Sequence, residues 1–127
     1  MSLYYRDALR RGQKEFRACT AQGKYPYLPV LDDFLPCEAT LRTVDLGVVQ
    51  IPLEMVCGTR TAGRTQAFAR NFMPLMEEDS EFALKWDTLC QSQVEEGIRE
   101  PIYAYEFMLR YYVQEGNKRV SVLKYMG

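Results

Sequence analysis

The sequence predicts an α+β protein in which a small mixed sheet is flanked by helices, with a helical extension at the N-terminus. Three observations support this fold class. Apolar residues recur at helical spacing over 3–22, a run rich in β-branched residues extends from Val44 to Ile51, and two aromatic segments, 102–107 and 109–114, lie close enough to form a hairpin. A chain of 127 residues can bury one core without disulfides or metal. We therefore expect a single globular unit.

Residues 1–43 are expected to form a helix and a proline-rich strap that pack on the core. Gly23 supplies the stop signal for the helix. Three prolines between Tyr25 and Pro36 exclude a regular helix and favour an extended chain across the core, with a short turn around 30–35. The rest of the chain, 44–127, is expected to be the sheet domain.

Within that domain, the run from Val44 to Ile51 is predicted to be the first core strand, because its β-branched residues suit a buried strand. A short helix is predicted over 66–73, with Phe68 and Phe72 facing inward. A longer helix is predicted over 81–96, with Trp86 beside its inward face. The inward residues of this longer helix are expected to be Phe82, Leu84 or the stem of Lys85, Leu89 and Val94.

Composition excludes several classes of chemistry. The chain has no histidine, and its four cysteines form no C-x-x-C pair, so zinc sites and histidine-dependent nucleophilic catalysis lack their residues. We expect neither zinc nor haem, and no protein-ligated metal site. No apolar run approaches the ~18 residues of a membrane helix, and no signal peptide is recognisable, so a cytoplasmic protein is expected. The net charge of -1 gives no general attraction to nucleic acid.

The strongest candidate site is the turn from Glu115 to Arg119. A strand is predicted to end at this glycine turn and a helix to begin at Asn117, which directs free backbone N–H groups and the positive end of a helix dipole at one point. Lys118 and Arg119 are cations at a helix end where cations cost roughly 0.3–1 kcal/mol each, so a nearby anion would offset them. The pattern predicts that Gly116, Asn117, Lys118 and Arg119 bind phosphate.

Two further features extend this prediction. The loop after the first strand carries Arg60, Thr61 and Arg64, which can contact phosphate through bidentate arginine and close backbone approach, although an ordinary surface loop is an equal alternative. Glu115 precedes the turn and is a candidate catalytic carboxylate that could accept a proton or help to hold magnesium. The alternative for Glu115 is a solvated residue at a strand end.

Four motifs together resemble the ParB/sulfiredoxin superfamily over about two-thirds of the chain. They are Ile51-Pro52-Leu53, Lys85-Trp86-Asp87-Thr88-Leu89, Pro101-Ile102 and Glu115-Gly116-Asn117-Lys118-Arg119. The N-terminal extension is similar to that of an uncharacterised bacterial branch with the same Glu-Gly-Asn-Lys-Arg turn. The resemblance implies a ParB/sulfiredoxin-like fold that binds CTP or ATP, with phosphates at a Gly-x-x-Arg turn.

Carried over by position, the resemblance makes Gly116 and Arg119 the glycine and arginine of that turn. Asn117 stands where sulfiredoxins have their catalytic cysteine, so sulfiredoxin activity is not expected. Lys85 and Thr88 are similar to a lysine and hydroxyl pair that contacts phosphates in sulfiredoxins, and a helix places them one turn apart.

These observations favour a nucleotide-binding regulatory domain of ParB type, linked to DNA or transcription, with ATP or CTP and magnesium as cofactor. Two alternatives remain open: an enzyme that transfers or hydrolyses the phosphoryl group of ATP or CTP, and a DNA-binding or nuclease-like module. A nucleotide or other phosphate ligand, DNA and a second copy of the chain are the partners considered, and no membrane is expected. A further hypothesis is that the chain is a fragment of a longer protein.

Overall fold

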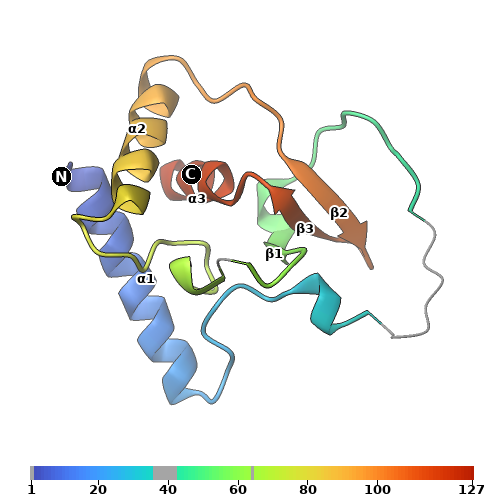
Figure 1. Ribbon diagram of the computed structural model, residues 1–127, viewed down its shortest axis with the longest axis horizontal. Helices are drawn as coiled ribbons and strands as arrows, with labels where there is room; N and C mark the ends of the chain where they lie inside the picture. The colour runs from blue at the N-terminus through green and yellow to red at the C-terminus, as the bar shows by residue number, and fades with distance from the viewer. Residues whose placement is uncertain (1, 36–42, 64) are drawn as a thin grey trace.

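The computed structural model describes residues 2–35, 43–63 and 65–127 (Figure 1). Over these residues the protein is α+β, with three α-helices and one three-stranded mixed sheet. The helices and strands, in chain order, are α1 (Leu3–Ala21), β1 (Val56–Thr59), α2 (Glu81–Glu95), β2 (Tyr103–Phe107), β3 (Arg110–Glu115) and α3 (Asn117–Met126). In Figure 1, α3 lies between the other two helices and the sheet.

Helix α1 forms where the apolar periodicity predicts it. Ser2 is its N-cap, and the Ser2 hydroxyl accepts a hydrogen bond from the backbone N–H of Tyr5 and donates one to the carboxylate of Asp87 on α2. The helix ends before Gly23, whose φ of +70° lies in the left-handed region. The expected stop at this glycine is confirmed.

The proline-rich strap covers the outer edge of β1. Val30 bridges Thr59 in parallel, and the backbone N–H of Thr59 donates to the carbonyl of Pro29 at 2.9 Å. Gly58 is required for this approach, because a Cβ there would lie 2.3 Å from the Pro29 oxygen. The strap also contains the expected short turn, a 3-10 helix at Leu31–Asp33.

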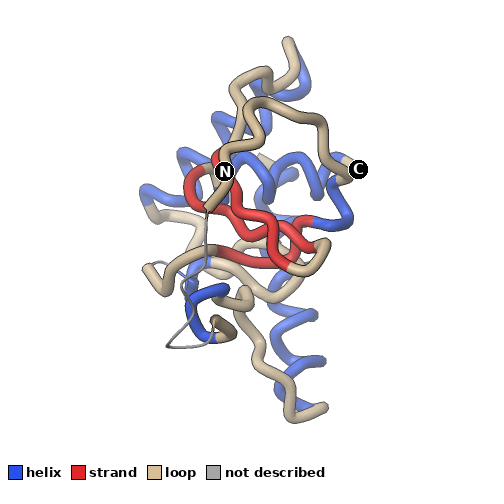
Figure 2. The backbone as a smooth tube through the Cα atoms, turned by 90° about the vertical axis from the view of Figure 1, so that its right-hand side faces the viewer, coloured by secondary structure: helices blue, strands red, loops and turns tan. Residues whose placement is uncertain are grey.

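The sheet has the strand order β1-β3-β2, with β3 in the centre. Strand β1 pairs with β3 in parallel, and β2 pairs with β3 antiparallel as the expected hairpin. The hairpin turn consists of Met108 and Leu109, both at positive φ (50° and 65°). Figure 2 shows the strands from the β2 side. Strand β3 runs directly into Gly116, as predicted.

The prediction of a core strand from Val44 to Ile51 is wrong. Residues 43–50 form no strand, and the side chains of Val44 and Val48 are 71% and 89% exposed. The first strand is instead β1, which begins after a 3-10 turn at Leu53–Met55. One edge of β1 pairs with β3 and the strap bridges its other edge, so no position beside β1 remains for the 43–50 segment.

The helix predicted over 66–73 is also wrong. Only Thr65–Ala67 is helical, as one 3-10 turn, and the chain then reverses at Phe72, whose φ is +69°. The backbone N–H of Ala69 donates to the carbonyl of Met73 at 2.8 Å across this reversal. The inward orientation of Phe68 and Phe72 is nevertheless confirmed, because they are 2% and 1% exposed.

Helix α2 has the expected extent, and its buried face agrees with the prediction in part. Trp86 is fully buried with Ala83 and Cys90, and Phe82 and Leu89, both expected inside, are partly buried against the core. Val94, also expected inside, is 52% exposed, and Leu84, given as an alternative to the stem of Lys85, is 61% exposed. The burial of Trp86 determines this face. Its indole N–H donates to the hydroxyl of the equally buried Ser121 on α3, at 2.9 Å.

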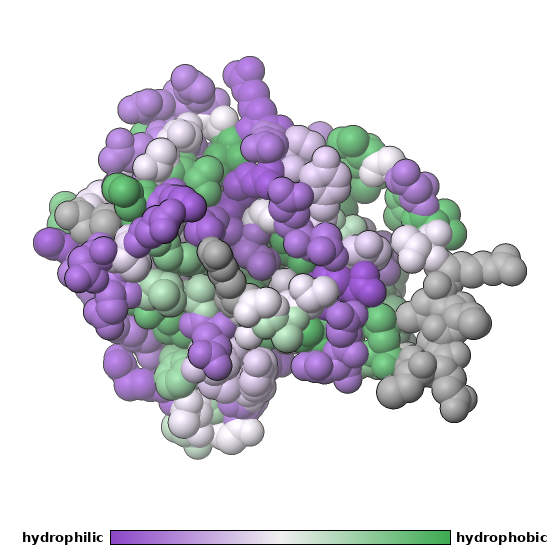
Figure 3. All heavy atoms as spheres, in the orientation of Figure 1, coloured by the Kyte–Doolittle hydropathy of each residue, from purple (hydrophilic) through white to green (hydrophobic). Residues whose placement is uncertain are grey.

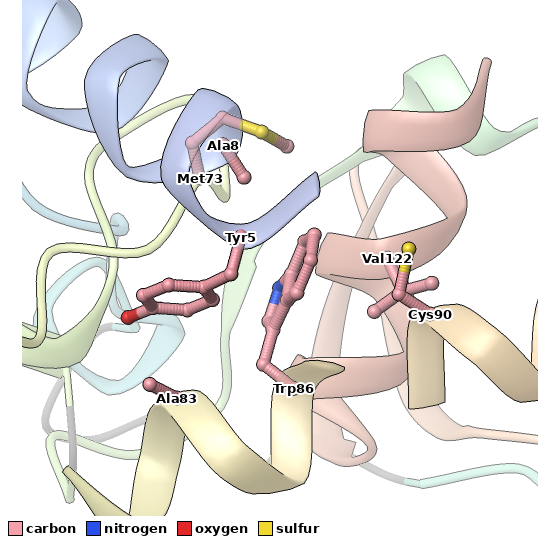
Figure 4. Close-up of a cluster of buried hydrophobic side chains, with 7 residues drawn as sticks. All are labelled: Tyr5, Ala8, Met73, Ala83, Trp86, Cys90 and Val122. Atoms are coloured by element: carbon pink, nitrogen blue, oxygen red, sulfur yellow. The ribbon is translucent and has the colours of Figure 1, made fainter. Parts of the chain in front are cut away.

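Two clusters of buried side chains make up the core. The first joins the three helices, and in Figure 4 the rings of Tyr5 and Trp86 lie side by side between α1 and α2, in an edge-to-face arrangement. The second joins the sheet, the strap and α3, where Val56 and Val113 of the sheet pack with Val120. Helix α3 contributes Val122 to the first cluster and Val120 to the second, and this holds its N-terminus at the end of β3.

Candidate functional site

The N-terminus of α3 is fixed by one glycine. Gly116 is the N-cap, with a φ of +115° and a ψ of 24°, and a Cβ at this position would lie 2.7 Å from Cγ2 of Ile102. No other residue fits here without strain in the backbone and displacement of Ile102. The glycine therefore determines both the direction of the helix and its closeness to the chain before β2.

The first turn of α3 has backbone donors that find no acceptor within the helix itself. The N-cap provides no side-chain hydrogen bond, and the first helical bond runs from the N–H of Val120 to the carbonyl of Gly116. The N–H groups of Asn117, Lys118 and Arg119 precede that bond and have no acceptor within the helix. Three donors at the positive end of a helix dipole are suited to an anion.

A pocket of about 490 Å³ opens at this helix end. It is lined by Gly116 to Arg119 of α3, by Lys85 of α2 and by Glu100 of the chain before β2. Its apolar wall consists of Phe68, Phe82 and Leu89. The pocket thus combines polar and cationic groups with a hydrophobic surface.

Two lysines reach this pocket from different helices. Lys85 forms an i,i+4 ion pair with Glu81 at 3.0 Å, and the side chain of Lys85 remains 59% exposed. The ammonium group of Lys118 lies 5.2 Å from the centre of the Phe82 ring. An exposed ion pair of this kind contributes little to stability, so Lys85 can turn towards an anionic ligand at small cost.

Arg119 is held by the protein itself. Its guanidinium donates to the carbonyl oxygens of Pro101 at 2.8 Å and Glu100 at 3.4 Å, and it lies 3.6 Å from the Glu100 carboxylate. The Arg119 side chain is only 12% exposed. In this arrangement Arg119 holds the chain before β2 against α3, and Lys85 is a more accessible cation of the pocket.

Asn117 connects the pocket to the sheet. Its side-chain N–H donates to the hydroxyl of Thr59 at 3.3 Å, and that hydroxyl donates to the carbonyl of Val113 at 3.0 Å. The amide oxygen of Asn117 is buried and has no hydrogen-bond partner in the described part of the chain. A buried acceptor without a donor costs about 1–3 kcal/mol.

Three other residues proposed from the sequence, Arg60, Thr61 and Thr88, are not among those that line this pocket. The guanidinium of Arg60 pairs with Asp32 of the strap at 2.9 Å and lies 4.5 Å from the ring centre of Tyr105 on β2. Thr61 is exposed, and Arg64 falls outside the described residues. Thr88 donates its hydroxyl to the carbonyl of Leu84 in its own helix at 2.9 Å.

Glu115, the candidate catalytic carboxylate, is exposed at the end of β3 and is not among the residues that line the pocket. The carboxylate that does line it is Glu100, which the sequence analysis did not single out. Nothing in the local sequence relates Glu100 to α3, because only the tertiary contact with Arg119 brings them together.

The apolar wall was also missed as part of the site, although a signal existed. Phe82 and Leu89 lie three residues before and four residues after Lys85, so a helix places all three on one side. Read together, this spacing indicates a cation set in an apolar surface.

Among the described residues, no three side chains of the metal-ligating types come close enough to hold a metal ion. Within the same residues, no helix combines the length and the apolar character that are needed to cross a membrane.

Comparisons of the chain with protein-family models, curated proteins and solved structures find no match.

Proposed function

We propose that the pocket at the N-terminus of α3 binds a nucleotide, with its phosphates at the first turn of the helix, and that the chain is a nucleotide-binding regulatory domain of ParB type. One observation carries this proposal. Lys85 and the turn from Gly116 to Arg119, more than 25 residues apart in the chain, line the same pocket.

The chemistry of the pocket favours a nucleotide over inorganic phosphate. The backbone N–H groups of the first turn and the ammonium groups of Lys85 and Lys118 are suited to phosphoryl oxygens. The apolar wall at Phe82 offers a surface for a base.

Binding is proposed rather than turnover. The enzymatic alternative relies on Glu115, which is exposed and is not among the residues that line the pocket. Release of phosphate from ATP or CTP, lost in Glu115→Gln while binding is retained, would establish that alternative instead.

Calorimetric titration tests the proposal. ATP and CTP, each with magnesium, are expected to bind, and inorganic phosphate is expected to bind more weakly than either. Lys118→Ala and Lys85→Ala are each expected to weaken nucleotide binding by about tenfold, which corresponds to about 1.4 kcal/mol. Arg119→Ala is a poor probe, because it also removes the hydrogen bonds to Glu100 and Pro101.

The matched control is Lys14→Ala, which removes an exposed lysine on α1 that does not line the pocket. The control is expected to bind nucleotide like the unmodified chain. If neither nucleotide binds at millimolar concentration, or if Lys14→Ala weakens binding as much as Lys118→Ala, the proposal is wrong.

A further inference from the structure

The segment Thr43–Gln50, here called the arm, has the sequence of a strand but is not one. Val44, Leu46 and Val48 alternate with Asp45 and Gly47, the period-2 pattern of a strand with one buried face. In the structure these three apolar side chains are 71%, 60% and 89% exposed. Figure 1 shows the arm arching outside β2, and Figure 2, viewed from that side, shows it as a loop.

The same side of the molecule carries an unpaired strand edge. Among the described residues, β2 pairs only with β3. The carbonyl of Val113, which stands opposite Ala104, accepts from Arg60 on the β1 side. Ala104 and Val113 are therefore a non-hydrogen-bonded pair of the antiparallel ladder, and so are Glu106 and Tyr111 two residues away. In such pairs the backbone N–H and C=O groups point away from the partner strand, so those of Ala104 and Glu106 point away from the sheet. They form an open template for another strand.

The exposed apolar surface is of the size that an interface requires. Besides the arm, Met108 and Leu109 at the hairpin tip are 81% and 70% exposed, and Tyr103 on β2 is 63% exposed. Together with the arm these side chains expose roughly 700–900 Å², close to the ~800 Å² that each partner buries in a standard interface. Figure 3 shows hydrophobic residues gathered on this side of the molecule.

We propose that the chain forms a two-fold dimer in which the arm of each copy pairs with the β2 edge of the other. Eight arm residues extend to about 26 Å and β2 covers about 17 Å, so the arm is long enough to follow the whole edge. Each exchange adds a fourth strand to a sheet, satisfies the outward groups of Ala104 and Glu106, and buries the alternating face of the arm.

A second copy is the occupant that the observations favour, because one molecule carries both unpaired halves. A reciprocal exchange satisfies two arms and two edges at once, which is the self-complementarity of a two-fold interface. The arm has a single charged residue, Asp45, so it offers little to a nucleic acid or to a highly charged protein. Its C-terminal neighbour Ile51 packs against the second core cluster and fixes the point from which the arm leaves.

The molar mass in solution, measured by sedimentation equilibrium over a concentration series, tests the exchange. The mass is expected to rise from 14.8 kDa towards twice that value. The double variant Leu46→Glu/Val48→Glu is expected to weaken the dimer by at least about tenfold without unfolding the chain, because both side chains are exposed in the monomer. The control Leu84→Glu alters an apolar residue on α2 that is equally exposed, at 61%, and is expected to leave the dimer unchanged.

A variant in the strand edge supplies the second half of the test. Ala104→Pro removes an outward N–H, which an edge strand tolerates, and is expected to leave the monomer folded and prevent pairing. Hydrogen exchange at Ala104 and Glu106 is expected to slow as the dimer forms.

Three outcomes overturn the proposal. The first is a molar mass of 14.8 kDa at every concentration up to millimolar. This outcome includes the case in which the arm pairs with β2 of its own chain and thereby protects the amides of Ala104 and Glu106 from exchange. The second is a double variant that dimerises as well as the unmodified chain. The third is a Leu84→Glu variant that weakens the dimer equally.

Discussion

Strand β3 and the arm Thr43–Gln50 have similar strand-forming content and opposite environments. Val113 in β3 is fully buried, whereas Val48 in the arm is 89% exposed. Strand β3 is paired on both sides, by β1 and β2, whereas the arm pairs with no strand in the described part of the chain. The difference shows that β propensity selects a segment able to form a strand, while the partners available in the fold decide whether it does.

The largest difference in stability is expected between two variants that place the same charge in β3 and in the arm. Val113→Asp buries an unpaired carboxylate in the second core cluster and is expected to lower the free energy of unfolding by about 4 kcal/mol or more. Val48→Asp is expected to change it by no more than about 0.5 kcal/mol. Urea denaturation in dilute solution measures both, and equal losses would show that the arm is part of the core.

A second comparison uses two glycines, Gly116 directly after β3 and Gly47 within the arm. Both have a positive φ, 115° and 71° respectively. Gly47→Ala meets no atom within 4 Å, so only the left-handed backbone opposes it, at about 1–2 kcal/mol. Gly116→Ala also displaces Ile102 and is expected to cost about 1–3 kcal/mol more. Urea denaturation of the two variants gives this difference, and equal costs would contradict the close contact with Ile102.

Substitutions at the hairpin tip change the exposed apolar surface without altering β3 or the arm. Met108→Asn with Leu109→Gly places residues that favour positive φ in the turn and is expected to stabilise the chain by about 1 kcal/mol. The same change removes apolar surface, so it is expected to weaken the proposed dimer. Thermal unfolding and sedimentation measure the two effects separately, and a loss of stability would mean that the tip contributes contacts within the monomer.

The smallest effect is confined to alkaline solution. The pKa of the Tyr112 phenol in β3 is raised from 10.0 to about 12. Burial is the largest cause, and the hydrogen bond with Cys57 is the second. A raised pKa favours the neutral phenol in the folded state. The resulting stabilisation is therefore complete below pH 10 and is lost as the pH rises through about 12.

Urea midpoints measured between pH 9 and about 12 are expected to fall for the unmodified chain and to fall less steeply for Tyr112→Phe. Parallel curves for the two proteins over this range would show that Tyr112 titrates alike in the folded and unfolded states.

Much of the backbone could be predicted because its signals are local. The end of α1 at Gly23, the β2–β3 hairpin and the start of α3 after Gly116 follow from residue types that restrict φ and ψ over a few positions. The same signals indicated the turn proposed to bind phosphate, since a strand, a glycine and a helix start are all recognisable in the sequence.

The composition of the pocket could be predicted only in part. Lys85 was identified by its motif, but the orientation of Arg60 towards Asp32 and of Arg119 towards Pro101 depends on residues 28 and 18 positions away. Glu100 carries no local signal at all. Side chains with several polar partners within reach are directed by the geometry of the assembled fold, which sequence spacing does not reveal.

The sequence by itself therefore determined the extents of α1 and α2, the β2–β3 hairpin, the lack of any histidine for site chemistry, and the cationic glycine turn at the start of α3. Tertiary structure alone decided that β1 rather than the arm enters the sheet, that Ala83 and Trp86 rather than Leu84 form the buried face of α2, and that Lys85 reaches the turn. The physical reason is the separation along the chain over which each interaction acts. Backbone sterics act between neighbours in the chain, whereas strand pairing, burial and charge placement depend on which distant segments occupy the limited space around each element.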